Sequence, residues 1–295
     1  MDSGKEEEPA QDKIKKTSER AQKLLPLEER SLDFEHGVHR YQFGNEMVVA
    51  VSAQTWADFT DSLSKVAADD RLVVSPELMT FTGQPLDELM DTRQIIENRV
   101  EELKEASKEH PQALFLLGTP TFPPKGKPRN SVLFIKNGRE VGQTNKRSGA
   151  TQTERENFDL LAEEQAVLVP GTNIGILICA DLPTITIFRS DNEDDLLRLL
   201  GRENFIGKTP TFIHPKARSL LVVSCWGVGG NRDFMRLGEA NTYYLAQLRG
   251  VVAHIMRVYP QIEEVLQVDR TPLMEKDDLP YTPTHPFNAH FQQKH

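Results

Sequence analysis

The sequence predicts an α/β protein in which two mixed sheets are stacked and helices cover the outside. One observation is the strand–helix–strand order over residues 47–77, which requires a crossover connection and parallel pairing. A second is the hairpin pattern over residues 131–143, whose Asn-Gly turn adds antiparallel pairing. The third is that a similar run of strands and helices stands before and after a polar, irregular stretch at residues 144–165, which favours two stacked sheets.

The individual elements follow from the spacing of apolar residues. Short apolar runs bounded by turn residues predict strands, and apolar residues three or four positions apart predict helices. Strands are predicted over residues 47–53, 72–77, 112–118, 131–135, 139–143, 174–178, 220–226 and 251–256. Helices are predicted over residues 56–68, 92–110, 191–200 and 234–248.

Composition and charge narrow the class of protein. The chain has 295 residues, 38% of them hydrophobic and 27% charged, which is typical of a soluble globular protein. Its net charge of −9 disfavours a nucleic-acid backbone or an anionic membrane as the main partner. No apolar run reaches the roughly 20 residues of a membrane helix, and the charged N-terminus does not resemble a secretory signal. The two cysteines lie in apolar runs and do not suggest a disulfide framework, so we expect a cytoplasmic protein.

The two ends of the chain differ in composition from its centre. Residues 1–40 are charged and predict a partly disordered N-terminal arm, in which residues 12–25 are compatible with one exposed helix. Residues 41–275 form the predicted domain, and residues 276–295 predict an extended C-terminal tail along the surface. We also expect an acidic insertion over residues 190–208.

Cys179 directly follows the apolar run at residues 174–178. A continuous apolar run indicates a strand that is covered on both faces, and the end of such a strand in an α/β sheet is where ligands bind. Asp181 and Pro183 follow shortly afterwards, which places the cysteine at a turn. Free cysteines also fill protein cores, so the position alone is compatible with simple packing.

Glu77 and Lys146 are the candidate partners of Cys179. Glu77 ends the strand at residues 72–77, and Lys146 follows the second strand of the hairpin, so one sheet edge can gather all three side chains. A carboxylate can take the thiol proton and later donate it to a leaving amine, and an ammonium can lower the thiol pKa and stabilise an oxyanion. Taken singly, Glu77 is also compatible with an exposed charge at the end of a strand, and Lys146 with an exposed lysine in a loop. A pair of Cys179 as nucleophile and His254 as base is the alternative.

These motifs resemble those of the nitrilase, or carbon–nitrogen hydrolase, superfamily over about residues 45–265. The resemblance is carried by the order and gaps of Glu77, Lys146 and Cys179, and by the residues around them: Pro76, Asn130, Gly138, Pro170-Gly171 and the run from Ile174 to Asp181. It implies an α-β-β-α sandwich that forms a homodimer, with Glu77, Lys146 and Cys179 as the catalytic triad. No metal or organic cofactor is implied.

The resemblance also implies further site residues. A second glutamate follows the lysine in many members, and Glu154 matches this place best, with Glu156 as the competitor. The candidate oxyanion and substrate-binding residues are Ala180, through its backbone N–H, together with Asp181 and Trp226.

The sequence departs from the family close to the predicted site. Ala180 replaces a usual aromatic residue, Pro183 replaces a frequent arginine, and Asn145 and Arg147 replace the usual neighbours of the lysine. No particular substrate is therefore carried over. We expect a cysteine-dependent hydrolase of a small amide that acts through a thioester. The alternatives are acyl transfer, nitrile hydrolysis, and a catalytically inactive binding or scaffold protein of the same fold.

Overall fold

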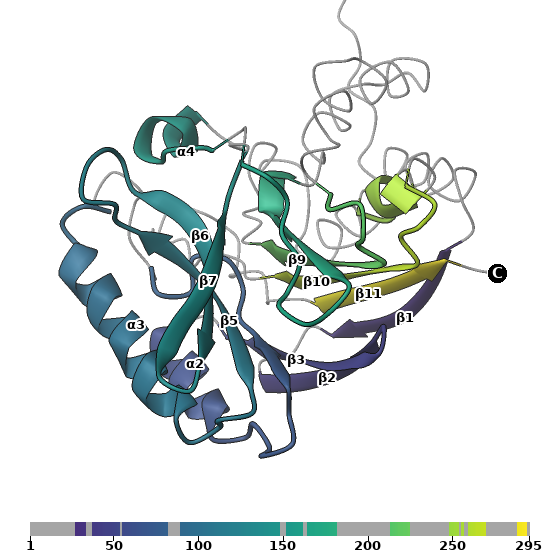
Figure 1. Ribbon diagram of the computed structural model, residues 1–295, viewed down its shortest axis with the longest axis horizontal. Helices are drawn as coiled ribbons and strands as arrows, with labels where there is room; N and C mark the ends of the chain where they lie inside the picture. Colours follow the sequence, from purple (N-terminus) through teal and green to yellow (C-terminus); the bar gives the residue numbers. More distant parts are fainter. Residues whose placement is uncertain are drawn as a thin grey trace, which may run out of the picture.

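The protein consists of two sheets that face each other, with helices against their outer faces (Figure 1). The computed structural model describes residues 27–33, 37–53, 55–81, 89–147, 152–161, 164–181, 213–224, 248–253, 255–256, 259–269 and 288–293. Within these residues one sheet has six strands and the other has five. Each sheet contains parallel and antiparallel pairs, which confirms the predicted class of two mixed sheets.

The six-stranded sheet contains the first part of the chain. Its strands lie in the order β2 (Gly37–Phe43), β3 (Glu46–Ser52), β4 (Leu72–Val74), β5 (Leu114–Thr121), β6 (Arg129–Lys136) and β7 (Arg139–Asn145). β3, β4 and β5 are parallel, because helices α2 (Trp56–Leu63) and α3 (Arg93–Ser107) cross over between them. β6 and β7 form the predicted hairpin, and Asn137 and Gly138 at its turn have positive φ angles of 47° and 77°.

The five-stranded sheet combines the two ends of the described chain with its centre. Its strands lie in the order β1 (Leu27–Asp33), β11 (Asn288–Gln293), β10 (Glu264–Asp269), β9 (Ser219–Ser224) and β8 (Ile174–Ile178). β8, β9 and β10 are parallel, so their carboxyl ends lie at one edge of the sheet. Every residue of β8 is buried, as its apolar sequence predicts.

The layers are held together by apolar side chains on both faces of each sheet. Alternate residues of both sheets fill the space between them, among them Val48, Val74, Ile176, Val223 and Val268. α2 and α3 cover the outer face of the six-stranded sheet, and helical residues 248–253 pack in the core on the other side, with β8, β9 and β10. The molecule therefore has the α-β-β-α layering that the sequence indicates.

The prediction of a strand over residues 251–256 is wrong. Residues 248–253 and 255–256 are helical, and Val251, Val252 and Ile255 pack against apolar residues of the five-stranded sheet. A short apolar run has the same composition in a buried helix and in a buried strand, so its periodicity does not separate the two.

The sheets also include residues outside the predicted domain. β1 and most of β2 lie within residues 1–40, and β11 lies within residues 276–295. β1 is an edge strand with exposed charged residues, and β11 buries polar residues such as Asn288 and His290. Neither strand was predicted, because neither contains the run of apolar residues by which a strand is predicted from the sequence.

Other predicted segments cannot be compared with the structure. The predicted helices over residues 12–25 and 191–200, residues 234–247 and the acidic insertion lie outside the described residues. Of the helices in the described part of the chain, none is long and apolar enough to cross a membrane.

Candidate active site

Each residue of the predicted triad follows a strand. Lys146 directly follows β7, Cys179 directly follows β8, and Glu77 lies shortly after β4. β4 and β7 belong to the six-stranded sheet, whereas β8 belongs to the five-stranded sheet. The N–H of Glu77 donates to the carbonyl of Ser224, the last residue of β9, at 3.3 Å. The site therefore lies where the edges of the two sheets meet.

The ammonium group of Lys146 lies between two carboxylates. Its Nζ is 2.8 Å from Oε1 of Glu77 and also donates to Oε1 of Glu154 on α4 (Gln152–Asn157). Asn130 on β6 donates its Nδ2 to the same two oxygen atoms, at 2.7 Å and 3.3 Å. All four residues are at most 6% exposed. We call Glu77, Asn130, Lys146 and Glu154 the carboxylate–lysine cluster.

The backbone around Glu77 is tightly packed. The following residue, Leu78, has a φ of 54° in the left-handed region. Gly118 on β5 lies against this segment. A Cβ at residue 118 would stand 2.2 Å from the carbonyl oxygen of Pro76 and 2.7 Å from Cα of Glu77. Glycine at this position lets β5 approach closely enough to hold Glu77 in the cluster.

Cys179 begins a short 3-10 turn, Cys179–Asp181, at the end of β8. Its φ of 44° costs a non-glycine residue on the order of 1–3 kcal/mol and persists where the surroundings fix it. Asp181 fixes the turn: its carboxylate accepts bonds from the N–H groups of Ile178, at 3.3 Å, and of Arg147, at 2.8 Å. The guanidinium Nε of Arg147 lies 3.6 Å from Oδ2 of Asp181, the oxygen that also accepts the N–H of Ile178. The turn of the cysteine is thereby tied to the residue that follows Lys146.

The buried charges shift one another's pKa values. Burial raises the pKa of the Cys179 thiol well above its ordinary value, the charge of Glu77 raises it further, and Lys146 lowers it only in part. Burial also raises the pKa of the Glu77 carboxyl, against the lowering effect of Lys146. For Lys146, burial alone would lower the pKa, but the charges of Cys179, Glu77 and Glu154 raise it well above the usual lysine value.

The expectation that Lys146 lowers the thiol pKa holds for the charge of the lysine itself. The lysine does lower the thiol pKa, but burial and Glu77 outweigh it, so Cys179 is a neutral thiol at neutral pH while Lys146 is an ammonium. A thiol in this state needs a base before it can act as a nucleophile. Glu77 is the carboxylate with the largest influence on the thiol.

The structure separates the candidate residues into three groups. Glu77, Lys146 and Glu154 are in contact, and Cys179 is close enough for their charges to act on its thiol. Asp181 lies against Arg147 and the backbone, as described above, and the competitor Glu156 is exposed.

The remaining candidates give less information. The backbone of Ala180 lies within the turn, whereas Trp226, His254 and Cys225 lie outside the described residues. Within the described ranges, no group of three or more His, Cys, Asp or Glu residues is arranged to hold a metal ion.

Asn130 and Arg147 take part in these contacts, although no role was predicted for either residue from the sequence. Asn130 belongs to the motifs of the resemblance, but its position near the start of β6 gives no sign that it meets two glutamates. Arg147 is a departure from the family, and its contact with Asp181 joins residues 34 positions apart. Asn130 stands between Arg129 and Ser131 at the polar start of β6, so no isolated polar position in an apolar run marks it.

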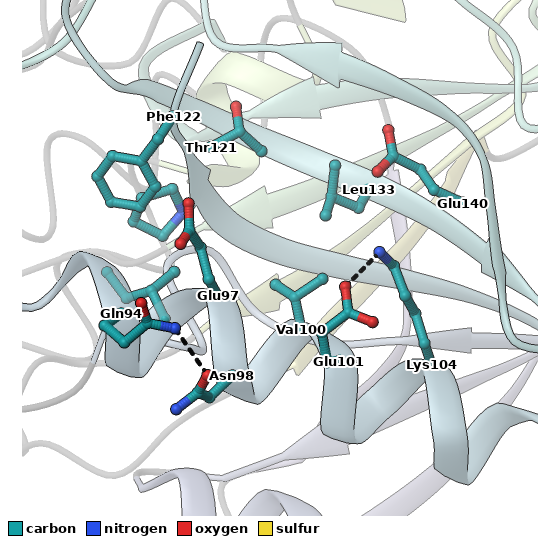
Figure 2. Close-up of a pocket in the computed structure, with 12 residues that line it drawn as sticks. Gln94, Glu97, Asn98, Val100, Glu101, Lys104, Thr121, Phe122, Leu133 and Glu140 are labelled. Carbon is teal, nitrogen blue, oxygen red and sulfur yellow. Dashed lines mark hydrogen bonds and ion pairs between the residues drawn. The ribbon is translucent and has the colours of Figure 1, made fainter. Parts of the chain in front are cut away.

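A groove of about 450 Å³ lies elsewhere, between α3 and the outer side of strands β5–β7 (Figure 2). It is lined by charged residues of α3, including Glu97, Glu101 and Lys104, and by Phe122 and Glu140 on the opposite side. None of the carboxylate–lysine cluster lines it. The groove is therefore separate from the candidate active site.

Comparison with known proteins identifies the fold. No protein-family model and no curated protein sequence matches the chain. A carbon–nitrogen hydrolase from Helicobacter pylori G27 matches in structure with a TM-score of 0.52 and 12% identity, over 85% of this chain and 80% of that one. A mutant of the amidase from Nesterenkonia sp. AN1, with acrylamide added at its active-site cysteine, matches with a TM-score of 0.51 and 11% identity, over 84% of this chain and 92% of that one.

A larger enzyme matches as well. The glutamine-dependent NAD+ synthetase from Acinetobacter baumannii has a TM-score of 0.47 and 16% identity over 80% of this chain, which spans 40% of that protein's length. The hydrolase and the amidase show that this chain has the fold of the nitrilase superfamily. The resemblance seen in the sequence is confirmed at the level of the fold.

Proposed function

We propose that the protein is a cysteine-dependent hydrolase of a non-peptide carbon–nitrogen bond, with a small amide as its substrate. The observation that carries this proposal is the buried bridge of Lys146 between Glu77 and Glu154, beside the strained turn of Cys179. Burying an ion pair is often no more stabilising than apolar packing, so stability alone gives no reason for this arrangement. Perturbed pKa values in such a cluster are typical of catalytic sites. The fold shared with a carbon–nitrogen hydrolase and an amidase supports the same reaction class.

The proposed reaction begins with a neutral thiol. Glu77 accepts the thiol proton while Sγ of Cys179 attacks the carbonyl carbon of the amide, and burial suits Glu77 to this step because it raises the pKa of the carboxyl. The carbonyl oxygen becomes an oxyanion, to which Nζ of Lys146 and the N–H of Ala180 donate hydrogen bonds. Glu154 holds the ammonium in place during this step.

The tetrahedral intermediate then breaks down and the enzyme is restored. Protonated Glu77 gives its proton to the amide nitrogen and the C–N bond breaks. Ammonia or an amine departs, and a thioester remains on Cys179. Water attacks the thioester carbon while Glu77 takes a proton from the water. The C–S bond breaks, the proton returns to the thiolate, and the carboxylic acid is released.

The test is ammonia release from small primary amides, from formamide to butyramide, by the full-length protein. Glu77→Gln removes the base but keeps the size of the side chain, so we expect kcat to fall by about 10²- to 10⁴-fold. Intact-mass spectrometry is expected to show an acyl adduct on the wild type and none on Cys179→Ala. Thermal unfolding of each variant controls for loss of the fold.

The opposite result is also informative. Turnover that survives in Cys179→Ala would refute the proposed nucleophile. Neither turnover nor adduct across the panel would favour the alternative of a catalytically inactive binding protein with the same fold.

A further inference from the structure

Asn130 touches the three charged members of the carboxylate–lysine cluster at once. Its backbone carbonyl accepts the N–H of Lys146 at 2.7 Å, and its side-chain Nδ2 donates to Oε1 of Glu77 at 2.7 Å and to Oε1 of Glu154 at 3.3 Å. Lys146 donates through Nζ to the same two oxygen atoms. One amide and one ammonium therefore hold the two carboxylates from two sides.

The orientation of the Asn130 amide follows from the chemistry of its neighbours. Turning the amide by half a rotation would place Oδ1, an acceptor, against two carboxylate oxygens, which are also acceptors. In the observed orientation Oδ1 is buried and has no hydrogen-bond partner among the described residues. A buried polar atom without a partner costs free energy, so the two bonds donated to the carboxylates are the contacts that fix this side chain.

We propose that Asn130 is a positioning residue of the catalytic site. This inference deepens the proposed function and rests on it. Asn130 and Lys146 together engage Oε1 of Glu77 and so set the orientation of the carboxylate that exchanges the proton with Cys179. Asn130 also fixes the distance between Glu77 and Glu154, and thereby the place of the ammonium between them.

The same contact affects the ionisation of Glu77. A hydrogen bond donated to a carboxylate favours the charged form, and Asn130 lowers the pKa of Glu77 against the raising effects of burial and of Glu154. The charged groups that face Glu77 are Lys146 after β7 and Glu154 on α4, and the Cys179 thiol lies beside them. Loss of the Asn130 amide is therefore expected to move the ionisation of Glu77 to higher pH.

The experiment compares Asn130→Ala with the matched variant Asn145→Ala. Asn145 is also a buried amide, on the neighbouring strand β7, but its Nδ2 donates to Glu164, at 2.9 Å and 3.1 Å, outside the cluster. The first measurement is the rate of Cys179 alkylation by iodoacetamide against pH, in the full-length protein. The inflection that belongs to Glu77 is identified by its absence in Glu77→Gln.

The expected result is an inflection at higher pH in Asn130→Ala and an unchanged one in Asn145→Ala. As a second measurement, kcat for butyramide is expected to fall by about 10- to 100-fold in Asn130→Ala with little change in KM, as for loss of a hydrogen bond to a charged group. A merely structural role would lower thermal stability without moving the inflection.

Two results would overturn the inference. One is an inflection that stays in place in Asn130→Ala, and the other is one that moves equally far in Asn145→Ala. If the wild type turns over no amide, the proposed function fails, and the alkylation profile still decides whether Asn130 positions Glu77.

Discussion

Lys146 and Arg147 are consecutive basic residues, both buried and both paired with acids, yet their surroundings differ. The ammonium of Lys146 bridges two side-chain carboxylates that come from separate elements, Glu77 after β4 and Glu154 on α4. The guanidinium of Arg147 faces Asp181, whose carboxylate is also held by two backbone N–H groups.

The difference indicates which pair is reactive and which is structural. Backbone N–H groups cannot change their protonation state, so Asp181 is fixed as an acceptor and the Cys179 turn is fixed with it. Burial raises the pKa of both carboxyls, but Glu77 is held by an ammonium and an amide, and its charge acts on the thiol. We therefore propose that Glu77 and Lys146 take part in proton transfer, and that Arg147 and Asp181 set the geometry of the proposed nucleophile.

The largest expected difference between the two pairs is in kcat, when each positive charge is removed in turn. Lys146→Met removes an oxyanion donor, so we expect kcat to fall by about 10²- to 10³-fold. Arg147→Met is expected to change kcat less than tenfold per folded molecule, because Asp181 keeps both backbone bonds. Lys146→Met leaves two buried carboxylates without their cation and Arg147→Met leaves one, and breaking a buried pair costs about 3–5 kcal/mol of unfolding free energy. Steady-state kinetics and urea unfolding measure the two quantities.

An equal loss of kcat in Arg147→Met and Lys146→Met would remove the distinction between the two pairs. Loss of stability in Arg147→Met without loss of kcat would sharpen it.

A backbone substitution tests the reactive pair without changing any charge. Gly118→Ala places a Cβ 2.2 Å from the Pro76 carbonyl oxygen, so the segment that carries Glu77 must shift. A displacement of about 1 Å at a catalytic group costs on the order of 10²-fold in rate, which is the expected fall in kcat. Gly142→Ala is the control, because its Cβ meets only the ring of Phe134, at 3.1 Å. Equal kcat values in the two variants would contradict the role given to this close approach.

The smallest expected effect is the position of the acid limb in the pH profile of kcat/KM. Glu77 accepts a proton only when it is ionised, so activity rises as pH increases through its pKa. Because burial raises that pKa, the limb is expected above the usual glutamate range. Asp181 makes no such contribution if it is purely structural, so Asp181→Asn should leave the limb in place. A limb at or below the ordinary glutamate value would contradict the assigned environment of Glu77.

The placement of the candidate residues could be predicted in large part from the sequence, because each residue of the predicted triad follows a strand signal. The apolar run before Cys179 and the hairpin before Lys146 define where β8 and β7 end, and strand ends gather at sheet edges. The predicted end of a strand at Glu77 is wrong, because β4 ends three residues earlier, at Val74. The contacts of Asn130 and Arg147 could not be predicted, because they depend on how two sheets and a short helix meet in space.

The errors in predicting strands and helices have other reasons. β1 and β11 carry many polar residues, and their place in the sheet is set by pairing with each other and with β10 rather than by apolar content. The apolar run at residues 251–256 met the criterion for a strand but is helical, because a helix buried against a sheet needs the same side chains.

The most direct test of the central claim is the rate at which iodoacetamide alkylates Cys179 at neutral pH, with Cys225 as the internal reference. Lys146 lowers and Glu77 raises the pKa of the thiol, and the thiolate is the reactive form. Because Glu77 is also the base that takes the thiol proton, we expect alkylation to be slower in both Lys146→Met and Glu77→Gln, and within about twofold of the wild type in Arg147→Met. Equal rates in all four proteins, or an Arg147→Met variant as slow as Lys146→Met, would contradict the claim that the carboxylate–lysine cluster controls the nucleophile.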